Sequence, residues 1–286
     1  MFFSVSSYSY SQLTGSGACA EKDLIALARA QGFAGIEFAD IHPPAGEDKE
    51  EYARTLAKEA KAQGIAIVAY CIGADLLNGG QAEIERLKGE VDIAAALGVS
   101  VMRHDATGGY PRETRSQRGF DNALPVIAAG YKEVTAYAKT KGIRTCIENH
   151  GYFCQDSARV EAIINCVADE NFGALVDIGN FLCADEDPAV AVGNIAPYAF
   201  HVHCKDFHKK SGNGFVPPDG FFRTRGGNYL RGAIIGHGVV PVLQCVRLLK
   251  EAGYDGWFTV EFEGMEEAKT GVAAGLSTLK KIETLL

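Results

Sequence analysis

Short β-branched or aromatic segments alternate along the whole chain with Ala-, Leu-, Lys- and Glu-rich segments of helical period. Eight such strand–helix units can be counted, and this repetition restricts the fold most, because it is typical of parallel sheets covered by helices. The expected strands are 2–8, 35–40, 65–73, 99–105, 144–150, 173–178, 199–205 and 257–263. The expected helices are 21–31, 49–63, 81–97, 121–141, 157–169, 239–252 and 266–285, with a shorter one near 187–196.

Glycines mark the ends of the expected helices, as a left-handed cap requires: Gly32, Gly64, Gly98, Gly142 and Gly253. An open doubly wound sheet would fit the same alternation, but it normally carries a glycine-rich phosphate motif after the first strand. The GSG at 15–17 is too short for that motif. We therefore expect an α/β fold, a single-domain (β/α)8 TIM barrel over residues 1–286, which is a usual length for this architecture.

Charge and hydropathy favour a soluble protein acting on small molecules. The chain has 28 Lys and Arg against 36 Asp and Glu, a net charge of −8, which argues against a nucleic-acid partner. We expect a cytoplasmic protein with no membrane contact, because no apolar run is long enough to span a bilayer and the N-terminus lacks a basic region. The eight cysteines are scattered without metal-site spacing and are expected to be reduced.

Four successive expected strands, the fifth to the eighth, each end near a residue that can bind a hard metal ion: Glu148, Asp177, His203 and Glu261. One such residue alone is more often a cap or an ion-pair partner. Four of them at the C-terminal ends of neighbouring barrel strands converge on one face, where reactive groups lie. Three carboxylates and one imidazole predict a single divalent ion such as Mn²⁺, Co²⁺, Mg²⁺ or Zn²⁺.

Other polar residues near these strand ends are candidates for substrate contacts. His150 follows Glu148 by two residues and would share its direction. In VMRHDA, either His104 or its neighbour Arg103 faces inward, and we expect His104. Glu37 is placed like a second-shell or sugar-contacting carboxylate, and His201 is expected to fill the barrel or orient a ligand.

Two long loops would border the mouth of such a barrel. The segment 207–238 is glycine-rich and is expected to lack regular structure, as lids and binding loops do, and it offers Arg225 to a substrate oxygen. A solvated loop or an oligomer contact is an equal alternative. The loop 107–119 is also basic, and these exposed mouth loops would suit a homo-oligomer such as a dimer.

The motifs IEN at 147–149, LVDIGN at 175–180, HVHCKD at 201–206 and VEFEG at 260–264 resemble those of the xylose isomerase-like TIM barrels over nearly the whole chain. That group includes sugar isomerases, ketose 3-epimerases, inosose dehydratase and endonuclease IV. The resemblance implies a metal bound by the four strand-end residues. It also implies that Glu148 and Glu261 act as the acid/base pair next to a carbonyl, through a metal-stabilised enediolate.

Three positions depart from the ketose 3-epimerases. Asn180 stands where they carry a histidine, Cys154 where they carry a glutamate, and Lys209 where they carry an arginine. These changes alter the groups that would hold sugar hydroxyls. The expected substrate contacts are therefore His150, Asn180, Lys209, Arg225 and His104.

The sequence thus predicts a metal-dependent sugar isomerase or epimerase that acts on a small-molecule sugar or sugar derivative. A lyase on the same scaffold is the alternative, either dehydrating an inosose-like ketone or eliminating a group from a 3-keto-glycoside. An endonuclease IV-like phosphodiesterase is a weaker alternative, because it requires about three zinc ions and several more inward histidines.

Overall fold

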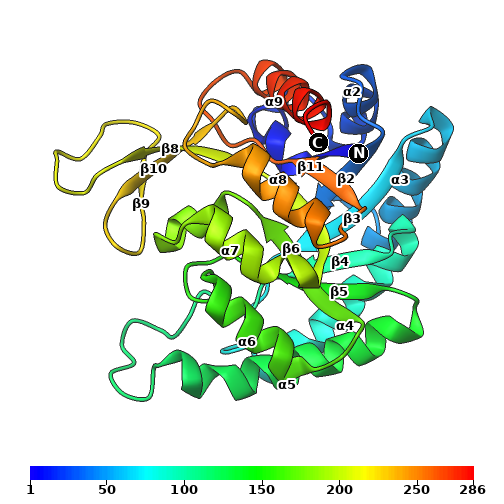
Figure 1. Cartoon of the computed structure of the whole chain (residues 1–286). Coiled ribbons are helices and arrows are strands. Elements are labelled where there is room, and N and C mark those ends of the chain that lie inside the picture. Colours follow the sequence, from blue (N-terminus) through cyan, green and yellow to red (C-terminus); the bar gives the residue numbers. More distant parts are fainter.

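The computed structural model describes residues 1–286 and contains a closed barrel of eight parallel strands surrounded by helices (Figure 1). The barrel strands are β1 (Phe2–Ser6), β2 (Gly35–Ala39), β3 (Ala66–Ile72), β4 (Val101–His104), β5 (Arg144–Glu148), β6 (Phe172–Asp177), β7 (Ala199–Cys204) and β11 (Trp257–Val260). They follow one another around the barrel in chain order, and β1 pairs with β11 to close it. The predicted (β/α)8 barrel is confirmed, and each expected strand overlaps an observed one.

Helices connect successive strands on the outside of the barrel (Figure 1). They are α1 (Ser11–Gly15), α2 (Leu24–Ala30), α3 (Lys49–Gln63), α4 (Gly80–Leu97), α5 (Phe120–Thr140), α6 (Ser157–Val167), α7 (Pro188–Ile195), α8 (Val242–Glu251) and α9 (Ala268–Glu283). Side-chain oxygens cap several of their first turns; Asp48, for example, accepts bonds from the first-turn amides of α3. All five glycines expected at helix ends have positive φ, which fits left-handed caps.

A chain of polar side chains runs through the barrel interior toward the C-terminal ends of the strands. Ser4 on β1 hydrogen-bonds to Thr259 on β11 at 2.7 Å, and Thr259 hydrogen-bonds to Nε2 of His201 at 2.8 Å. The same nitrogen lies 2.9 Å from Oε2 of Glu37. Because every member is buried and bonded to the next, the column supports groups at the mouth without leaving unsatisfied charge beneath them.

The segment after β7 forms an antiparallel arm that projects from the barrel beyond the helices (Figure 1). Its strands are β8 (Asp206–Lys210), β9 (Phe222–Arg223) and β10 (Tyr229–Ala233), and β10 pairs with both of the others. The expectation that 207–238 lacks regular structure is therefore wrong. The longer of the two pairings, between β8 and β10, joins residues that are distant in sequence, such as Asp206 and Ala233, so no local sequence pattern reveals it.

Two further observations concern the chain as a whole. None of the helices combines the length and the apolar character that crossing a bilayer demands. The eight cysteines form no disulfide, and six of them are buried, as the sequence predicts for scattered thiols.

Candidate metal centre

The C-terminal ends of β5, β6, β7 and β11 bring together the four side chains expected from the sequence. One ligand atom each from Glu148, Asp177, His203 and Glu261 lies within 4.8 Å of the others, and all four residues are buried. Nδ1 of His203 lies 3.7 Å from Glu148, 3.9 Å from Asp177 and 3.3 Å from Glu261. Divalent ions bind such atoms at about 2.0–2.6 Å, so small side-chain movements would complete a coordination sphere.

The hydrogen bonding of these residues fits a cation at their centre. Nδ1 of His203 is buried and has no hydrogen-bond partner, and the buried Oδ2 of Asp177 and Oε2 of Glu261 face only the ammonium of Lys205, at 3.4 and 2.6 Å. The second polar atoms of His203 and Asp177 are bonded elsewhere; Oδ1 of Asp177 accepts the backbone N–H groups of Gly179 and Asn180, both at 2.8 Å. Leaving buried polar atoms unpaired is costly, and a shared ion would satisfy all three.

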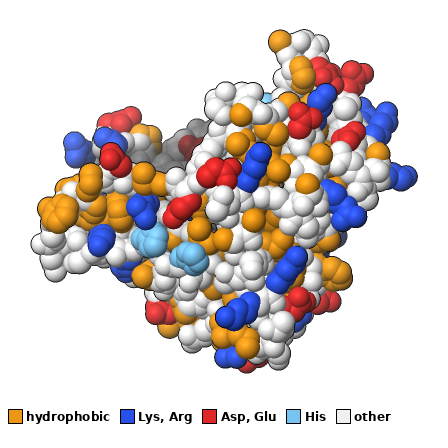
Figure 2. All heavy atoms as spheres, turned by 90° about the horizontal axis from the view of Figure 1, so that it is seen from above, with side chains coloured by type: hydrophobic (Ala, Val, Ile, Leu, Met, Phe, Trp, Pro, Cys, Tyr) orange, Lys and Arg blue, Asp and Glu red, His pale blue; other side chains and the backbone are white.

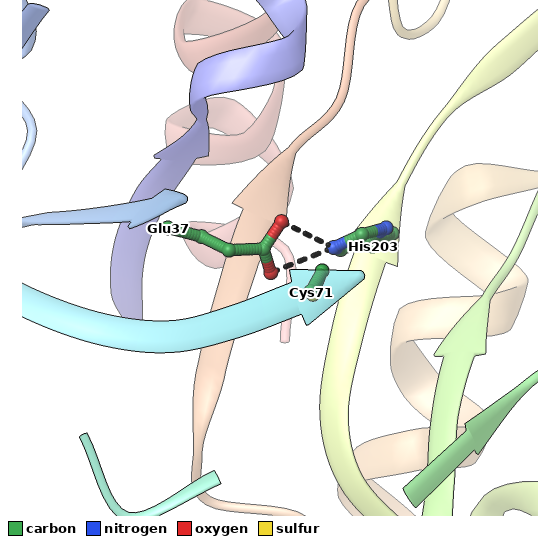
Figure 3. Close-up of side chains that lie close together, drawn as sticks. All are labelled: Glu37, Cys71 and His203. Atoms are coloured by element: carbon green, nitrogen blue, oxygen red, sulfur yellow. Dashed lines mark hydrogen bonds and ion pairs between the residues drawn. The ribbon is translucent and has the colours of Figure 1, made fainter. Parts of the chain in front are cut away.

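Glu37 on β2 sets the orientation of His203, as Figure 3 shows. Its two oxygens lie 2.9 and 2.8 Å from Nε2 of His203, so the ring donates from Nε2 and keeps Nδ1 for a ligand. Burial alone would raise the pKa of Glu37, but the charges and hydrogen bonds of His203 and His201 hold it well below its usual range. Cys71 on β3 lies beside this pair.

Asp177 is held by an exchange of hydrogen bonds with the strand next to it. Asn149 donates to the carbonyl of Asp177 at 2.9 Å and accepts its amide at 3.0 Å. Burial, reinforced by Glu261 and Glu148 and opposed by Lys205, raises the pKa of Asp177 to about 7. Three carboxylates gathered in one buried site are the electrostatic setting that a divalent cation relieves.

Arg103 on β4 is the cation that pairs with Glu148. Its guanidinium contacts Glu148, lies 2.9 Å from Asp105 and donates to the carbonyl of Ile72 at 3.0 Å. The expectation that His104 faces inward is wrong. His104 points to the helix side, where its ring stacks on Tyr131 of α5, and it lines neither mouth cavity.

Lys205, the residue after β7, is the second cation of the site. Its ammonium lies 2.6 Å from Glu261, 3.4 Å from Asp177 and 3.5 Å from Glu263. The side chain is buried, whereas by sequence alone Lys205 could equally be an ion-pair partner in a loop. The only local indication of a role in the site is that Lys205 follows His203 by two residues. Residues at this spacing in a strand point to the same face.

A cavity of about 380 Å³ opens over these groups at the mouth of the barrel. Polar residues dominate its lining, including His150, whose Nδ1 lies 2.9 Å from Asp105. Burial lowers the pKa of His150, but its hydrogen bond to Asp105 and the negative charges of Asp105 and Glu148 together raise the pKa overall. A second cavity of about 270 Å³ adjoins the first and shares His150, Lys205 and Glu263 with it.

Of the remaining predicted substrate contacts, Asn180 lies beside the metal centre, whereas Lys209 and Arg225 lie outside it. Asn180 lines the second cavity, donates to Glu148 at 3.0 Å and accepts from Lys205 at 3.3 Å. Lys209 lies on the exposed part of β8 and borders neither mouth cavity. Arg225 is bound to Asp156 and to the carbonyl of Tyr152, so neither cation reaches the metal centre in this conformation.

Charged side chains of both signs are interspersed with apolar ones over the face of the molecule that Figure 2 shows. No continuous basic surface lies on that face. The arginines of the loop 107–119 are exposed and do not line the mouth cavities.

Residues 25–282 match the xylose isomerase-like TIM barrel family, and the chain belongs to that family. The inosose dehydratase of Serratia proteamaculans is 28% identical over 146 residues, which are 48% of this chain and 47% of that protein. The chain thus aligns with about half the length of the curated relatives it matches.

Solved structures share the fold across nearly the whole chain. L-ribulose 3-epimerase superposes with a TM-score of 0.73 at 18% identity, covering 99% of this chain and 95% of that one. The IOLI protein with a bound zinc atom gives a TM-score of 0.74 at 17% identity, covering 99% and 98%. At this level of identity the likeness establishes the fold alone.

Proposed function

We propose that the protein is a divalent-metal-dependent sugar isomerase or epimerase that transfers a proton at the carbon next to a carbonyl. The observation that carries the proposal is the convergence of four buried ligand atoms below a polar cavity, among them an Nδ1 of His203 that has no hydrogen-bond partner. A cavity of about 380 Å³ is of the size that small ligands occupy. A small-molecule sugar is therefore the proposed partner, and the net charge of −8 supports it over nucleic acid.

In this proposal Glu148, Asp177, His203 and Glu261 hold one divalent ion, which when bound would polarise the carbonyl and stabilise the enediolate charge. Glu148 and Glu261 extend into the cavity from β5 and from the end of β11, two strands that are separated by β6 and β7. Carboxylates on different sides of the cavity can remove a proton from one face of a substrate carbon and return it to another. Lys205 and Arg103, each beside one of these carboxylates, hold them in the ionised form that accepts a proton.

The test is solvent deuterium exchange into a panel of keto and aldo sugars, followed by NMR, with metal-loaded and EDTA-treated protein. Exchange next to the carbonyl should require the metal and should be lost in Glu148→Gln and Glu261→Gln. Glu113→Gln, on the exposed loop 107–119, is the matched control that should keep it. Exchange that persists in the fully stripped protein would rule out the proposed metal role.

A lyase on the same scaffold is the second candidate, and the adjoining cavity is the observation that favours it. Tyr152 and Phe222 contribute aromatic surface to that cavity, which opens beside His150 at the edge of the first. A group eliminated from a sugar ketone would have space there. In the same NMR experiment, a lyase would release water or an aglycone and form an unsaturated ketone, whereas an epimerase would return an intact sugar that differs only in stereochemistry and incorporated deuterium.

We also propose that the projecting arm contacts a second copy of the chain. Phe215 and Val216 at its end are 84% and 67% exposed, while Lys209, Lys210 and Arg223 give it a basic character in an otherwise acidic protein. Light scattering of the wild type and of Phe215→Ser should show a dimer that the substitution weakens. A monomer in the wild type would contradict this contact.

A further inference from the structure

Both cations that line the mouth cavity, Arg103 and Lys205, already have carboxylate partners outside the proposed ligand set. Arg103 lies 2.9 Å from Asp105, and Lys205 lies 3.5 Å from Glu263. If a metal ion bound the three ligand carboxylates, Arg103 would still be paired with Asp105, and Lys205 would still be paired with Glu263. We propose, resting on the sugar-converting function above, that the site takes an uncharged polyhydroxylated carbonyl compound and discriminates against phosphorylated or carboxylated sugars.

The charge around the cavity supports this substrate class. Seven carboxylates line or underlie it: Asp40, Asp105, Glu148, Asp177, Glu261, Glu263 and Glu37. Three cations oppose them, namely Arg103, Lys205 and Lys49, the last paired with Asp40 at 2.9 Å. A divalent ion would offset two of the four remaining negative charges. The cavity therefore stays negative and repels a second anion.

The donors of the two cations are also committed to other groups. Lys205 is 5% exposed, and its ammonium faces three carboxylates and the side-chain oxygen of Asn180. Arg103 is 8% exposed; one terminal nitrogen pairs with Asp105 and Glu148, the other donates to a backbone carbonyl, and its Nε is buried without a partner. A phosphate or carboxylate needs donors that are free to bind it in a fork or as a point charge. Neither cation offers that without giving up a buried ion pair.

The basic residues around the mouth do not supply a replacement. Arg225 is bound to Asp156 and to the carbonyl of Tyr152, and Arg231 stacks over Phe221. Neither lines the mouth cavities. The partly exposed carboxylates Asp105 and Glu263, by contrast, are acceptors suited to sugar hydroxyls.

The experiment compares each neutral ketose or inosose with its phosphate ester or carboxylated analogue, using metal-loaded full-length protein and solvent deuterium exchange. For at least one pair, the neutral member should exchange with a kcat/KM at least about 100-fold higher. A second readout is calorimetric binding of sorbitol and sorbitol 6-phosphate, in which only the uncharged polyol should bind. Faster exchange or tighter binding of the anionic members would overturn the inference and leave the proposed chemistry intact.

Two variants test the cause of the discrimination. Glu263→Gln should release Lys205, and Asp105→Asn should release Arg103, so each should shift the neutral-to-anionic ratio of kcat/KM toward the anion by about tenfold. Glu113→Gln removes the same charge outside the cavity and should leave the ratio unchanged. Unchanged ratios in both folded cavity variants would contradict the assigned pairing. If no compound of either kind exchanges, the proposed function fails, and this inference fails with it.

Discussion

The barrel mouth has two halves that differ in what their polar atoms are bonded to. In the ligand half, formed by β5, β6, β7 and β11, Nδ1 of His203 has no hydrogen-bond partner, and the inward oxygens of Asp177 and Glu261 face only the Lys205 ammonium. In the supporting half, formed by β1 to β4, Glu37 on β2 is bonded to His203, and Arg103 on β4 is paired with Glu148 on the adjacent strand β5. The difference teaches that the mostly anionic ligand half is positioned by groups from the supporting half.

The largest expected effect comes from removing a ligand without changing its shape. Asp177→Asn keeps an oxygen for the backbone N–H groups that Oδ1 accepts but replaces the inward anionic oxygen with an amide. Metal affinity should fall by more than about 100-fold, because the ion loses one of three anionic ligands. Calorimetric titration with Mn²⁺ and Zn²⁺ measures this effect. Asp156→Asn, at the cap of α6, is the control, and equal affinities in the two variants would remove Asp177 from the ligand set.

The supporting half should matter by a smaller factor. Glu37→Gln preserves the size of the side chain but weakens the acceptor that fixes the His203 ring. Metal affinity should fall by about 10- to 100-fold, the usual consequence of losing a second-shell carboxylate. The same titration measures it, with the exposed Glu59→Gln as control. If Glu37→Gln lowered the metal affinity as much as Asp177→Asn does, the supporting half would not differ from the ligand half in its importance for metal binding.

Lys205 should act in the opposite direction, because its ammonium competes with a metal ion for Glu261 and Asp177. Lys205→Met should raise metal affinity by about three- to tenfold, the effect expected when a unit positive charge leaves a partly screened site. Lys209→Met removes the same charge from the exposed arm and should change the affinity little. Weaker binding in Lys205→Met would instead mean that the ammonium mainly organises the ligand carboxylates.

The ligand half could be predicted from sequence far better than the supporting half. Glu148, Asp177, His203 and Glu261 lie at or just after the ends of strands that are apolar and bounded by clear helices, so their convergence follows from the barrel alone. Which side chains of β4 point into the barrel could not be predicted in this way. It has only four residues, all buried, and polar Arg103 and His104 adjoin each other, so alternation does not decide which one points inward.

The same limit applies to contacts that join distant segments. The bond between Glu37 and His203 spans 166 residues, and the arm strands pair through a glycine-rich segment with no strand alternation of its own. Sequence reasoning placed Glu37 among second-shell candidates but could not name its partner. Lys209 was expected because it stands where the ketose 3-epimerases carry an arginine, and Arg225 because it lies in the long loop, whereas the arm holds both away from the cavity.

Substitution of His104 should have the smallest effect on the site. His104 lies on β4, a strand of the supporting half, but its side chain faces α5. Burial lowers its pKa to about 4, so the unfolded chain binds a proton at higher pH than the folded protein does. Stability should therefore fall as the pH drops from about 6.5 toward 4, by at most about 1.4 kcal/mol per unit. Between pH 6.5 and 5, this effect should lower the free energy of unfolding of the wild type by about 2 kcal/mol. His104→Gln lacks the titrating ring, so its free energy of unfolding should not show this part of the decrease.

Urea unfolding of the two proteins at both pH values measures this difference, because all other titrating groups are common to them. Metal affinity and the KM for any exchanging sugar should change by less than about twofold in His104→Gln, since the ring stacks on Tyr131 and does not line the cavity. A large rise in KM with unchanged pH dependence would return His104 to the substrate site. It would also show that β4 can turn His104 instead of Arg103 toward the mouth. The division between the two halves would then depend on which of these two residues faces the cavity.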